Sequence, residues 1–273
     1  MASPATASPT TPGTSSPPVG TGSLSGGVVP DYKDWVAEGK VSAVKDQQNC
    51  GSCWAFSAAA AFESKLAIEQ GISWDQSVQQ LLDCVDDSSG YTARTGCGPG
   101  MSTEAMGFLA SRGGASASSY GSYQAKKGSC RTGVTTAHHI TSSPGYRDIT
   151  PASATELMKA VAQQPVVVLV WWPAYVRDVR GLFNGGCPSK PADSEDADGQ
   201  YSSQYGVGAN HEMLVVGYDA RGGIGAPNSY FKVKNSWGTA VGNSGYFNLH
   251  MQPDGSGGIC GLYSAPVAPL DVS

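Results

Sequence analysis

The chain has 273 residues, enough to bury a substantial core in one large domain or two smaller ones. Only 14% of the residues are charged, against about 25% in an average soluble protein. The formal net charge of −5 argues against a nucleic-acid partner, because a phosphate backbone is bound through clustered Lys and Arg. No run of about 18 apolar residues is present, so we expect no membrane-spanning segment. These properties predict a soluble globular protein.

The N-terminal segment 1–27 contains no charged residue and is dominated by Ser, Thr, Pro and Gly. Such a composition cannot bury enough apolar surface to offset its ordering entropy, so we expect a disordered or glycosylatable arm. The segment lacks the basic start and the apolar run of a signal peptide, so we do not expect it to be one. The folded part is expected to start near Val28 and to include residues 28–273.

Helical patterns come first in the folded part, and strand patterns follow. Residues 53–69 are rich in Ala and Leu, lack Gly and Pro, and are followed by Gly71, which predicts a mostly buried helix. β-Branched and aromatic runs between Gly-rich turns predict strands in the second half. The expected helices are 53–69, 75–83, 103–112 and 156–163, and the expected strands are 166–172, 212–218, 229–235 and 245–251. This order predicts an α+β fold in two lobes.

Seven cysteines suggest paired disulfides plus one free thiol, although all seven would be reduced in a cytosolic protein. Cys53 lies in the first turn of the helix predicted over 53–69, where the positive end of the helix favours a thiolate. A nucleophilic thiolate also needs a base and an oxyanion stabiliser. Cys50 and Cys53 could instead form a redox pair or half of a zinc site. A zinc site would need a second close Cys/His pair, and a redox pair would need a βαβ pattern; the sequence has neither.

The wider pattern is more specific than the two cysteines alone. Gln47, the string CGSCW at 50–54, the pair NH at 210–211 before a strand, and NSWG at 235–238 after a strand occur in that order. Together with VPDYKDW (29–35), QLLDC (80–84), GCGPG (96–100) and CGLY (260–263), they make residues 29–265 resemble the papain-like cysteine peptidases.

The resemblance implies a fold of two lobes with the substrate cleft between them. One is a helical lobe of about 41–143, and the other is an antiparallel, β-barrel-like lobe of about 144–262. The strand near 28–35 would cross to this second lobe. Six cysteines allow fifteen pairings, and the resemblance suggests three disulfides, namely Cys50–Cys97, Cys84–Cys130 and Cys187–Cys260.

The resemblance also implies catalytic roles. Cys53 matches the nucleophile, His211 the base that pairs with it, and Asn235 the amide that orients the imidazole. Gln47 matches the side-chain donor of the oxyanion hole, beside the backbone N–H of Cys53. Trp237 matches the indole that shields the His–Asn hydrogen bond from water.

Each histidine has an alternative interpretation. His211, next to an apolar strand, could be a core histidine with satisfied hydrogen bonds. The pair His138-His139 could correspond to the occluding-loop histidines of cathepsin B-type enzymes, but no cysteines flank it, so an ordinary connector is favoured. His250 follows the pattern of an exposed strand residue.

The sequence departs from the family in three respects: two insertions, Pro99 and Glu212. Two insertions, an acidic one at 187–211 and a Gly-rich one at 219–228, place His211 and Asn235 farther from Cys53 than is usual. Pro99 cannot donate a backbone hydrogen bond, whereas Gly100, which would pair with the substrate backbone, is present.

The third departure is Glu212, in a position that the resemblance assigns to the S2 pocket. That pocket binds the second residue before the cut, and its expected lining is Met101, Leu169, Ala209, Glu212 and Ala265. Four of these are apolar and favour an aliphatic or aromatic side chain. Glu212 could turn outward to solvent, or it could point inward and accept Lys or Arg. In the inward case we expect the preference for a basic side chain to rise between about pH 4 and 6.

The reaction implied by the resemblance is thiolate attack, acyl-enzyme formation and hydrolysis, with no metal and no organic cofactor. Polypeptides are the expected substrates, and a pro-segment or a protein inhibitor is the expected partner of a monomeric, secreted or lysosome/vacuole-type enzyme made as a zymogen. Two rival functions remain: a catalytically dead homologue that serves in binding or storage, and a transpeptidase that uses the same acyl-enzyme.

Overall fold

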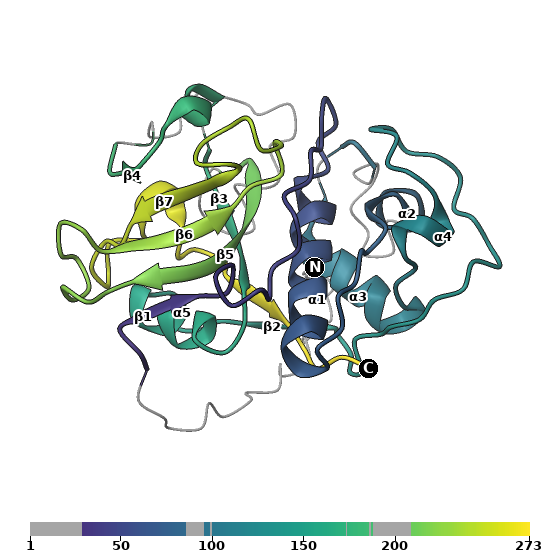
Figure 1. Ribbon diagram of the computed structural model, residues 1–273, viewed down its shortest axis with the longest axis horizontal. Helices are drawn as coiled ribbons and strands as arrows, with labels where there is room; N and C mark the ends of the chain where they lie inside the picture. The colour runs from purple at the N-terminus through teal and green to yellow at the C-terminus, as the bar shows by residue number, and fades with distance from the viewer. Residues whose placement is uncertain (1–28, 86–95, 99, 173, 186, 188–208) are drawn as a thin grey trace, which may run out of the picture.

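The computed structural model describes residues 29–85, 96–98, 100–172, 174–185, 187 and 209–273. The expected arm at 1–27 and most of the acidic insertion lie outside these residues. In the described part, a twisted sheet stands on one side and most of the helices on the other, with α1 (Cys53–Glu69) between them (Figure 1). The predicted α+β fold is confirmed.

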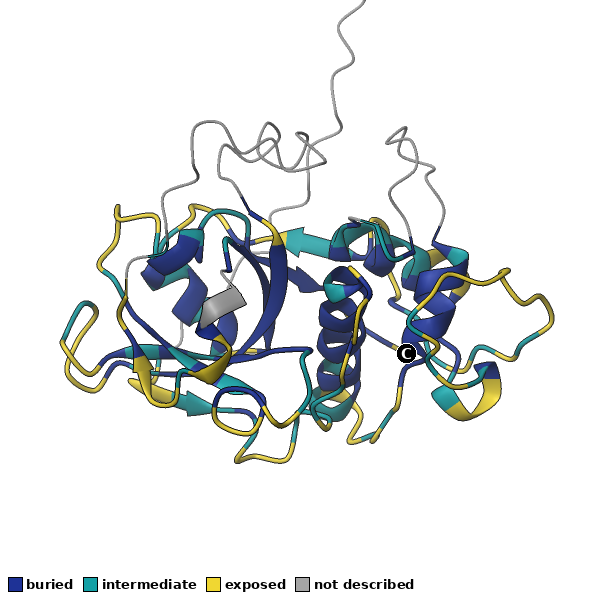
Figure 2. Cartoon of the chain, turned by 90° about the horizontal axis from the view of Figure 1, so that it is seen from above, coloured by how far each residue is buried: buried dark blue, intermediate teal, exposed yellow. Residues whose placement is uncertain are grey.

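Helix α1 is the central element, and its bounds are those predicted from sequence. Figure 2 shows α1 coloured as buried along most of its length. Its buried side chains include Trp54, Phe62 and Leu66. A helix that is apolar all round is stable only where protein covers it on all sides. The sheet covers one side of α1 and helices α2 (Val78–Cys84) and α3 (Ser102–Arg112) cover the other.

The remaining helices show why sequence patterns misplace some ends. Helix α2 starts at Val78 instead of residue 75, because the Ser77 side chain accepts a hydrogen bond from the backbone N–H of Gln80 and caps the helix. Helix α5 (Ala154–Val161) is capped in the same way by Ser153. Helix α4 (Ala117–Tyr120) has only four residues and was not predicted, because it is too short to show a helical period.

The described strands form one sheet in the order β2-β8-β3-β5-β6-β7-β4, with β1 also pairing with β5. The pairs are antiparallel except β4 with β7, which is parallel. Within the described residues the sheet is open, which corrects the expectation of a barrel-like lobe. The strands are β1 (Tyr32–Asp34), β2 (Tyr146–Asp148), β3 (Val166–Val170), β4 (Leu182–Phe183), β5 (His211–Asp219), β6 (Tyr230–Lys234), β7 (Tyr246–His250) and β8 (Val267–Pro269).

Strand β5 is buried on both faces, because it lies between two apolar cores. Met213 and Val215 point into the core that the sheet shares with α5, whereas Leu214 and Val216 point into the core around α1. The alternation of a strand sends successive side chains to opposite faces. His211 and Glu212, the first two residues of β5, are therefore directed to different sides of the sheet.

The cysteines of the described residues form three disulfides, Cys50–Cys97, Cys84–Cys130 and Cys187–Cys260. Cys53 is the one left free. These are the pairs that the family resemblance implies. No helix in the described part of the chain is long and apolar enough to cross a membrane.

Candidate active site

Cys53 is the first residue of α1 and is partly exposed at the helix N-terminus. The backbone N–H groups of Cys53, Trp54 and Glu212 face its sulfur and favour the ionised form. Two of these donors belong to α1, and the third belongs to the start of β5. The thiol therefore lies where the buried helix meets the first residues of this strand.

His211 and Asn235 are joined by a hydrogen bond. His211 Nε2 lies 2.7 Å from Asn235 Oδ1, and both side chains are buried. Strands β5 and β6 pair antiparallel, with Leu214 opposite Lys234. This pairing brings His211, the first residue of β5, beside Asn235, the residue that follows β6. Because Nε2 is engaged by Asn235, Nδ1 is the ring nitrogen left for a proton transfer.

Trp237 packs against the imidazole of His211, with ring centroids 4.9 Å apart and planes inclined by 38°. The Arg177 guanidinium lies 5.8 Å from the Trp237 ring centroid. An indole in this position restricts the access of water to the His211–Asn235 hydrogen bond, which strengthens that bond electrostatically.

Gln47 is buried beside the same residues, because residues 45–47 run along 236–238. The backbone N–H of Gln47 donates to Ser236 O at 2.8 Å, and the Ser236 hydroxyl donates to Gln47 Oε1 at 2.6 Å. Gln47 Nε2 in turn donates to Cys50 O at 2.8 Å. These bonds hold the amide plane, and the bond to Cys50 uses only one of the two hydrogens on Nε2.

Gly100 lies against the indole of Trp54, the residue after the free cysteine. A Cβ at position 100 would lie 2.6 Å from the Trp54 ring, so a residue with a side chain would force the backbone away from it. Only glycine allows this approach. Pro99 lies outside the described residues.

Glu212 points inward and is 3% exposed, so the outward alternative is wrong. Its Oε1 accepts a hydrogen bond from the backbone N–H of Ser102 at 3.2 Å, and its Oε2 has no partner among the described residues. The carboxyl lines a pocket that we call the Glu212 pocket. Its walls are Met101, Ser102, Thr103, Val167, Leu169, Glu212, Ala265 and Val267.

Four of the five residues expected in the S2 pocket thus lie together in the Glu212 pocket: Met101, Leu169, Glu212 and Ala265. Ala209 is buried but is not among the described residues that line this pocket. It belongs to the acidic insertion predicted at 187–211, of which residues 188–208 lie outside the described residues.

Burial disfavours each charge of the site when that charge stands alone. It raises the pKa of the Cys53 thiol to about 12, with the negative charge of Glu212 as a second cause. It lowers the pKa of His211 to about 4, although the hydrogen bond that His211 Nε2–H donates to Asn235 Oδ1 opposes this shift. A thiolate and an imidazolium that formed together at close range would attract each other, and this attraction would offset part of the loss of solvation.

Burial also raises the pKa of Glu212 to about 7, although the hydrogen bond from Ser102 opposes this shift. Glu104 on α3 adds a further negative charge nearby. Glu212 is therefore largely protonated in acidic solution and largely ionised in alkaline solution. Its ionised form disfavours a thiolate at Cys53.

The other histidines have structural contacts. His138 Nδ1 lies 3.1 Å from Ser273 O, and its ring packs edge-on against Trp74, which favours the ordinary connector interpretation. The expectation of an exposed His250 is wrong. This side chain is buried, with Nε2 3.0 Å from Ala226 O, because the insertion at 219–228 folds over the end of β7.

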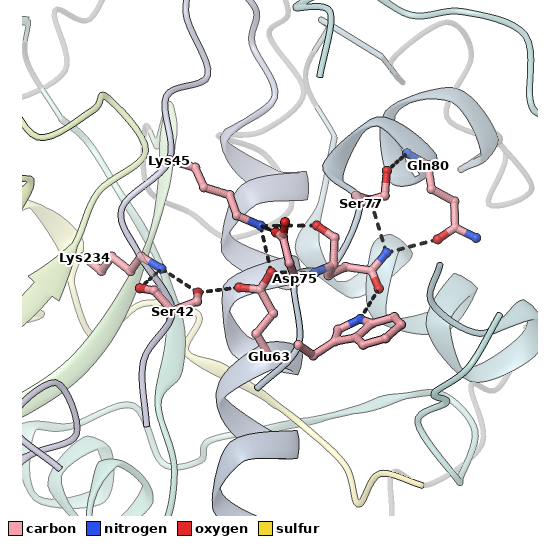
Figure 3. Close-up of polar contacts among 9 residues, drawn as sticks. Ser42, Lys45, Glu63, Asp75, Ser77, Gln80 and Lys234 are labelled. Carbon is pink, nitrogen blue, oxygen red and sulfur yellow. Dashed lines mark hydrogen bonds and ion pairs between the residues drawn. The ribbon is translucent and has the colours of Figure 1, made fainter. Parts of the chain in front are cut away.

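A polar network behind the site joins α1 to the end of β6 (Figure 3). The Glu63 carboxylate binds Lys45 Nζ at 2.8 Å and also accepts the Ser42 hydroxyl. Lys234, the residue before Asn235, donates to Ser42 O at 2.8 Å, and Lys45 also pairs with Asp75 at 2.6 Å. Segment 42–45 thus ties the strand that carries Asn235 to the helix that carries Cys53.

Sequence reasoning missed Ser236, Ser102 and this network. The signal for Ser236 was within the NSWG string, but a serine there has no distinctive pattern of its own. In the described residues, no group of three or more His, Cys, Asp or Glu side chains could hold a metal ion.

Comparison with known proteins decides the family. Residues 29–270 match the family model described as papain family cysteine protease. The chain belongs to the papain family.

Individual relatives agree with this assignment. Stem bromelain of Ananas comosus is 33% identical over 243 residues, which cover 88% of this chain and 98% of that protein. The probable cysteine protease RDL2 of Arabidopsis thaliana is 33% identical over 251 residues, which cover 91% of this chain but only 62% of RDL2. The chain therefore spans less than two thirds of the length of this relative.

A solved structure shows the same fold. The bromelain protease from Ananas comosus, solved in complex with the E64 inhibitor, superposes with a TM-score of 0.72 at 34% identity. The match covers 89% of this chain and 100% of that one.

Proposed function

We propose that the chain is a cysteine endopeptidase in which Cys53 is the nucleophile, His211 the acid/base and Asn235 the residue that orients the imidazole. The observation that carries this proposal is the hydrogen bond of 2.7 Å between His211 Nε2 and Asn235 Oδ1. It leaves Nδ1 of His211 for a thiol that faces the adjacent N–H of Glu212. Family membership supports the same roles.

The reaction begins when the Cys53 thiol gives its proton to His211. The thiolate attacks the carbonyl carbon of the scissile peptide bond and forms a tetrahedral oxyanion. His211 then donates the proton to the leaving amine, which leaves an acyl-enzyme on Cys53. Water, activated by His211, attacks the thioester and releases the second product.

Two donors are available for the oxyanion, namely the backbone N–H of Cys53 and the second N–H of Gln47 Nε2. Ser236 supports this role of Gln47, because its hydroxyl holds the amide oxygen at 2.6 Å and so orients the amide nitrogen. Donors that are oriented before the reaction stabilise developing charge without a reorganisation cost.

The substrate is a polypeptide in extended conformation. Gly100 supports this, because its backbone runs close over Trp54, beside Cys53, and an extended peptide pairs with such an edge through main-chain hydrogen bonds. Three disulfides favour a secreted or lysosome/vacuole-type location, since oxidised cysteines persist outside the reducing cytosol. A pro-segment or protein inhibitor that covers the cleft stays a prediction.

The direct test is hydrolysis of fluorogenic peptides and denatured casein by the wild type and by Cys53→Ala and His211→Ala variants. We expect both substitutions to abolish turnover while circular dichroism stays unchanged. His138→Ala is the matched control for a lost histidine and should retain full activity. Turnover by Cys53→Ala would refute the proposal, and product mass spectrometry with an added amine acceptor separates hydrolysis from transpeptidation.

A further inference from the structure

Segment 47–52 begins with Gln47 and leads into α1, and its backbone includes an unfavourable conformation. Gln48 has a φ of 54°, in the left-handed region that residues with a side chain rarely adopt. Such a conformation persists only where the surrounding structure holds the backbone in place. The contacts that hold this segment therefore also determine where the amide of Gln47 lies.

Ser52, the residue before α1, does not cap the helix. A serine in this position usually accepts a hydrogen bond from a backbone N–H of the first turn, as Ser77 does in α2 and Ser153 does in α5. The Ser52 side chain makes no such bond. It is fully buried, and its hydroxyl lies 2.7 Å from the hydroxyl of Tyr123. The serine at the start of α1 thus makes a tertiary contact in place of a cap.

The hydroxyl of Tyr123 joins the two ends of this segment. It donates to the backbone O of Gln47 at 3.0 Å. A phenol has one hydrogen to donate, so Ser52 is the donor in the bond between the two hydroxyls. Burial raises the pKa of Tyr123 above the ordinary 10, which keeps the phenol protonated at neutral pH. One hydroxyl therefore binds both Gln47 and the residue before Cys53.

Tyr123 is itself held by two helices. It follows α4, on the side of the molecule where most of the helices lie (Figure 1). Its ring packs edge-on against Phe56 of α1, with ring centroids 5.0 Å apart. Gln79 of α2 accepts the backbone N–H of Gln124 at 2.8 Å and donates to Lys126 O at 2.9 Å. The hydroxyl is thus presented from a fixed support.

The bond from Tyr123 acts on a different part of Gln47 from the bonds described above. Ser236 holds the backbone N–H and Oε1 of Gln47, and Nε2 donates to Cys50 O. Tyr123 binds the backbone carbonyl. That carbonyl belongs to the peptide unit between Gln47 and Gln48, where the left-handed conformation begins. The tyrosine hydroxyl therefore fixes the peptide unit that carries the strain.

We propose that Tyr123 is a positioning residue for the oxyanion hole, whose hydroxyl holds the Gln47 peptide unit and thereby orients the free N–H of Gln47 Nε2 toward the oxyanion. The proposal rests on the proposed function, which assigns the donor role to Gln47. A donor that is oriented before the reaction stabilises the transition state. A residue that orients such a donor therefore raises kcat and leaves ground-state binding unchanged.

The first test is Tyr123→Phe, which removes the hydroxyl and keeps the ring against Phe56. We expect kcat to fall about 10-fold, the rate equivalent of one lost hydrogen bond, with KM unchanged. Tyr120→Phe is the matched control and should retain the wild-type kcat, because the Tyr120 hydroxyl is bonded to Asp83 and to the N–H of Arg131. An unchanged kcat in Tyr123→Phe, or an equal loss in both variants, would overturn the proposal.

A double-mutant cycle tests whether Tyr123 acts through Gln47. The donor is absent in Gln47→Ala, so adding Tyr123→Phe to that variant should lower kcat by less than about 2-fold. A further loss of about 10-fold would show that the tyrosine acts in another way and would overturn the proposal.

Alkylation of Cys53 provides a second readout, because iodoacetamide forms no oxyanion. The alkylation rate should be the same in Tyr123→Phe and in the wild type. A slower rate in Tyr123→Phe would show that the loss of the hydroxyl disturbs the thiolate, and would contradict a role through Gln47.

If the wild type cleaves no peptide, the proposed function fails, and hydrogen exchange then tests the contact alone. The backbone N–H of Gln47 is bonded to Ser236 O, so its exchange rate, followed by NMR in a Cys53→Ala background, reports on how firmly the segment is held. We expect faster exchange in Tyr123→Phe than in Tyr120→Phe. Equal exchange rates would show that the hydroxyl does not hold Gln47 and would refute the proposal.

Discussion

Replacement of Glu212 by Gln should change how the free energy of unfolding depends on pH. The folded protein keeps the Glu212 proton up to a pKa of about 7, whereas the ordinary value is 4.5. Between these values the folded state binds more protons than the unfolded state, so its stability falls as the pH rises. Below about pH 4.5 both states hold the proton, and the contribution is constant.

The size of the effect follows from the raised pKa. A difference of about 2.5 units, at 1.36 kcal/mol per unit, corresponds to about 3 kcal/mol at pH 8. The glutamine side chain has the same shape but does not titrate. We therefore expect the free energy of unfolding of Glu212→Gln, measured relative to the wild type, to rise by about 3 kcal/mol from pH 4 to pH 8.

The assay is urea unfolding at several pH values, with both proteins in a Cys53→Ala background to prevent self-digestion. The relevant quantity is the change with pH in the stability difference between the two proteins, because any loss of packing in the variant is the same at every pH. A stability difference that is constant from pH 4 to pH 8 would refute the buried, destabilised carboxylate.

Three further substitutions test other parts of the structure. Gly100→Ala should lower kcat/KM at least about 10-fold and the free energy of unfolding by about 1–3 kcal/mol, because the new Cβ would clash with Trp54. Steady-state kinetics and urea unfolding measure the two effects. Unchanged kcat/KM and unchanged stability would contradict the close approach of Gly100 to Trp54. Gln47→Ala should lower kcat by about 10²- to 10³-fold. Gln48→Ala changes an exposed neighbour and should leave kcat unchanged. Equal kcat values for the two variants would remove Gln47 from the mechanism. Burial lowers the pKa of Lys234 to about 8 from the ordinary 10.5. Between these pH values the unfolded state binds more protons than the folded state, so Lys234 makes the free energy of unfolding rise with pH. In Lys234→Met this rise in the free energy of unfolding should be absent when urea unfolding is measured from pH 7.5 to 9.5. If the stability of the variant depends on pH in the same way as that of the wild type, the prediction is wrong.

The sequence predicted α1 to the residue, because its Ala-rich composition and the following Gly71 are local signals. The strands of the second half were predicted for the same reason, since β-branched runs between glycines need no tertiary information. The short elements α4, β2, β4 and β8 were missed, because a segment of two to four residues has no measurable period. Their conformations depend on partners far away in the chain, as β8 does on β2 and β3.

The site was predictable where a local string carries it, as with the residues around Cys53, His211 and Asn235. Glu212 was recognised as a departure from the family, but its orientation was left open. That orientation depends on the N–H of Ser102 in α3 and on pocket walls from β3 and β8, which are distant in the sequence. His250 was misjudged since the alternation of β7 does not reveal the loop that covers its end. The network of Ser42, Lys45, Glu63 and Lys234 joins distant segments, and no pairwise pattern in the sequence indicates it.

The central claim is that Cys53 reacts as a thiolate paired with the His211 imidazolium, although burial alone disfavours each charge. The most direct test is the rate of alkylation by iodoacetamide from pH 4 to pH 11, with the labelled peptide mapped at each pH. We predict that Cys53 is the labelled cysteine and that its rate is already high near pH 6, because the ion pair supplies the reactive thiolate. In His211→Ala the labelling near pH 6 should be lost. A rate in the wild type that stays low at pH 6 and climbs beyond pH 10, as for an unpaired thiol whose ionised form is poorly solvated, would contradict the account.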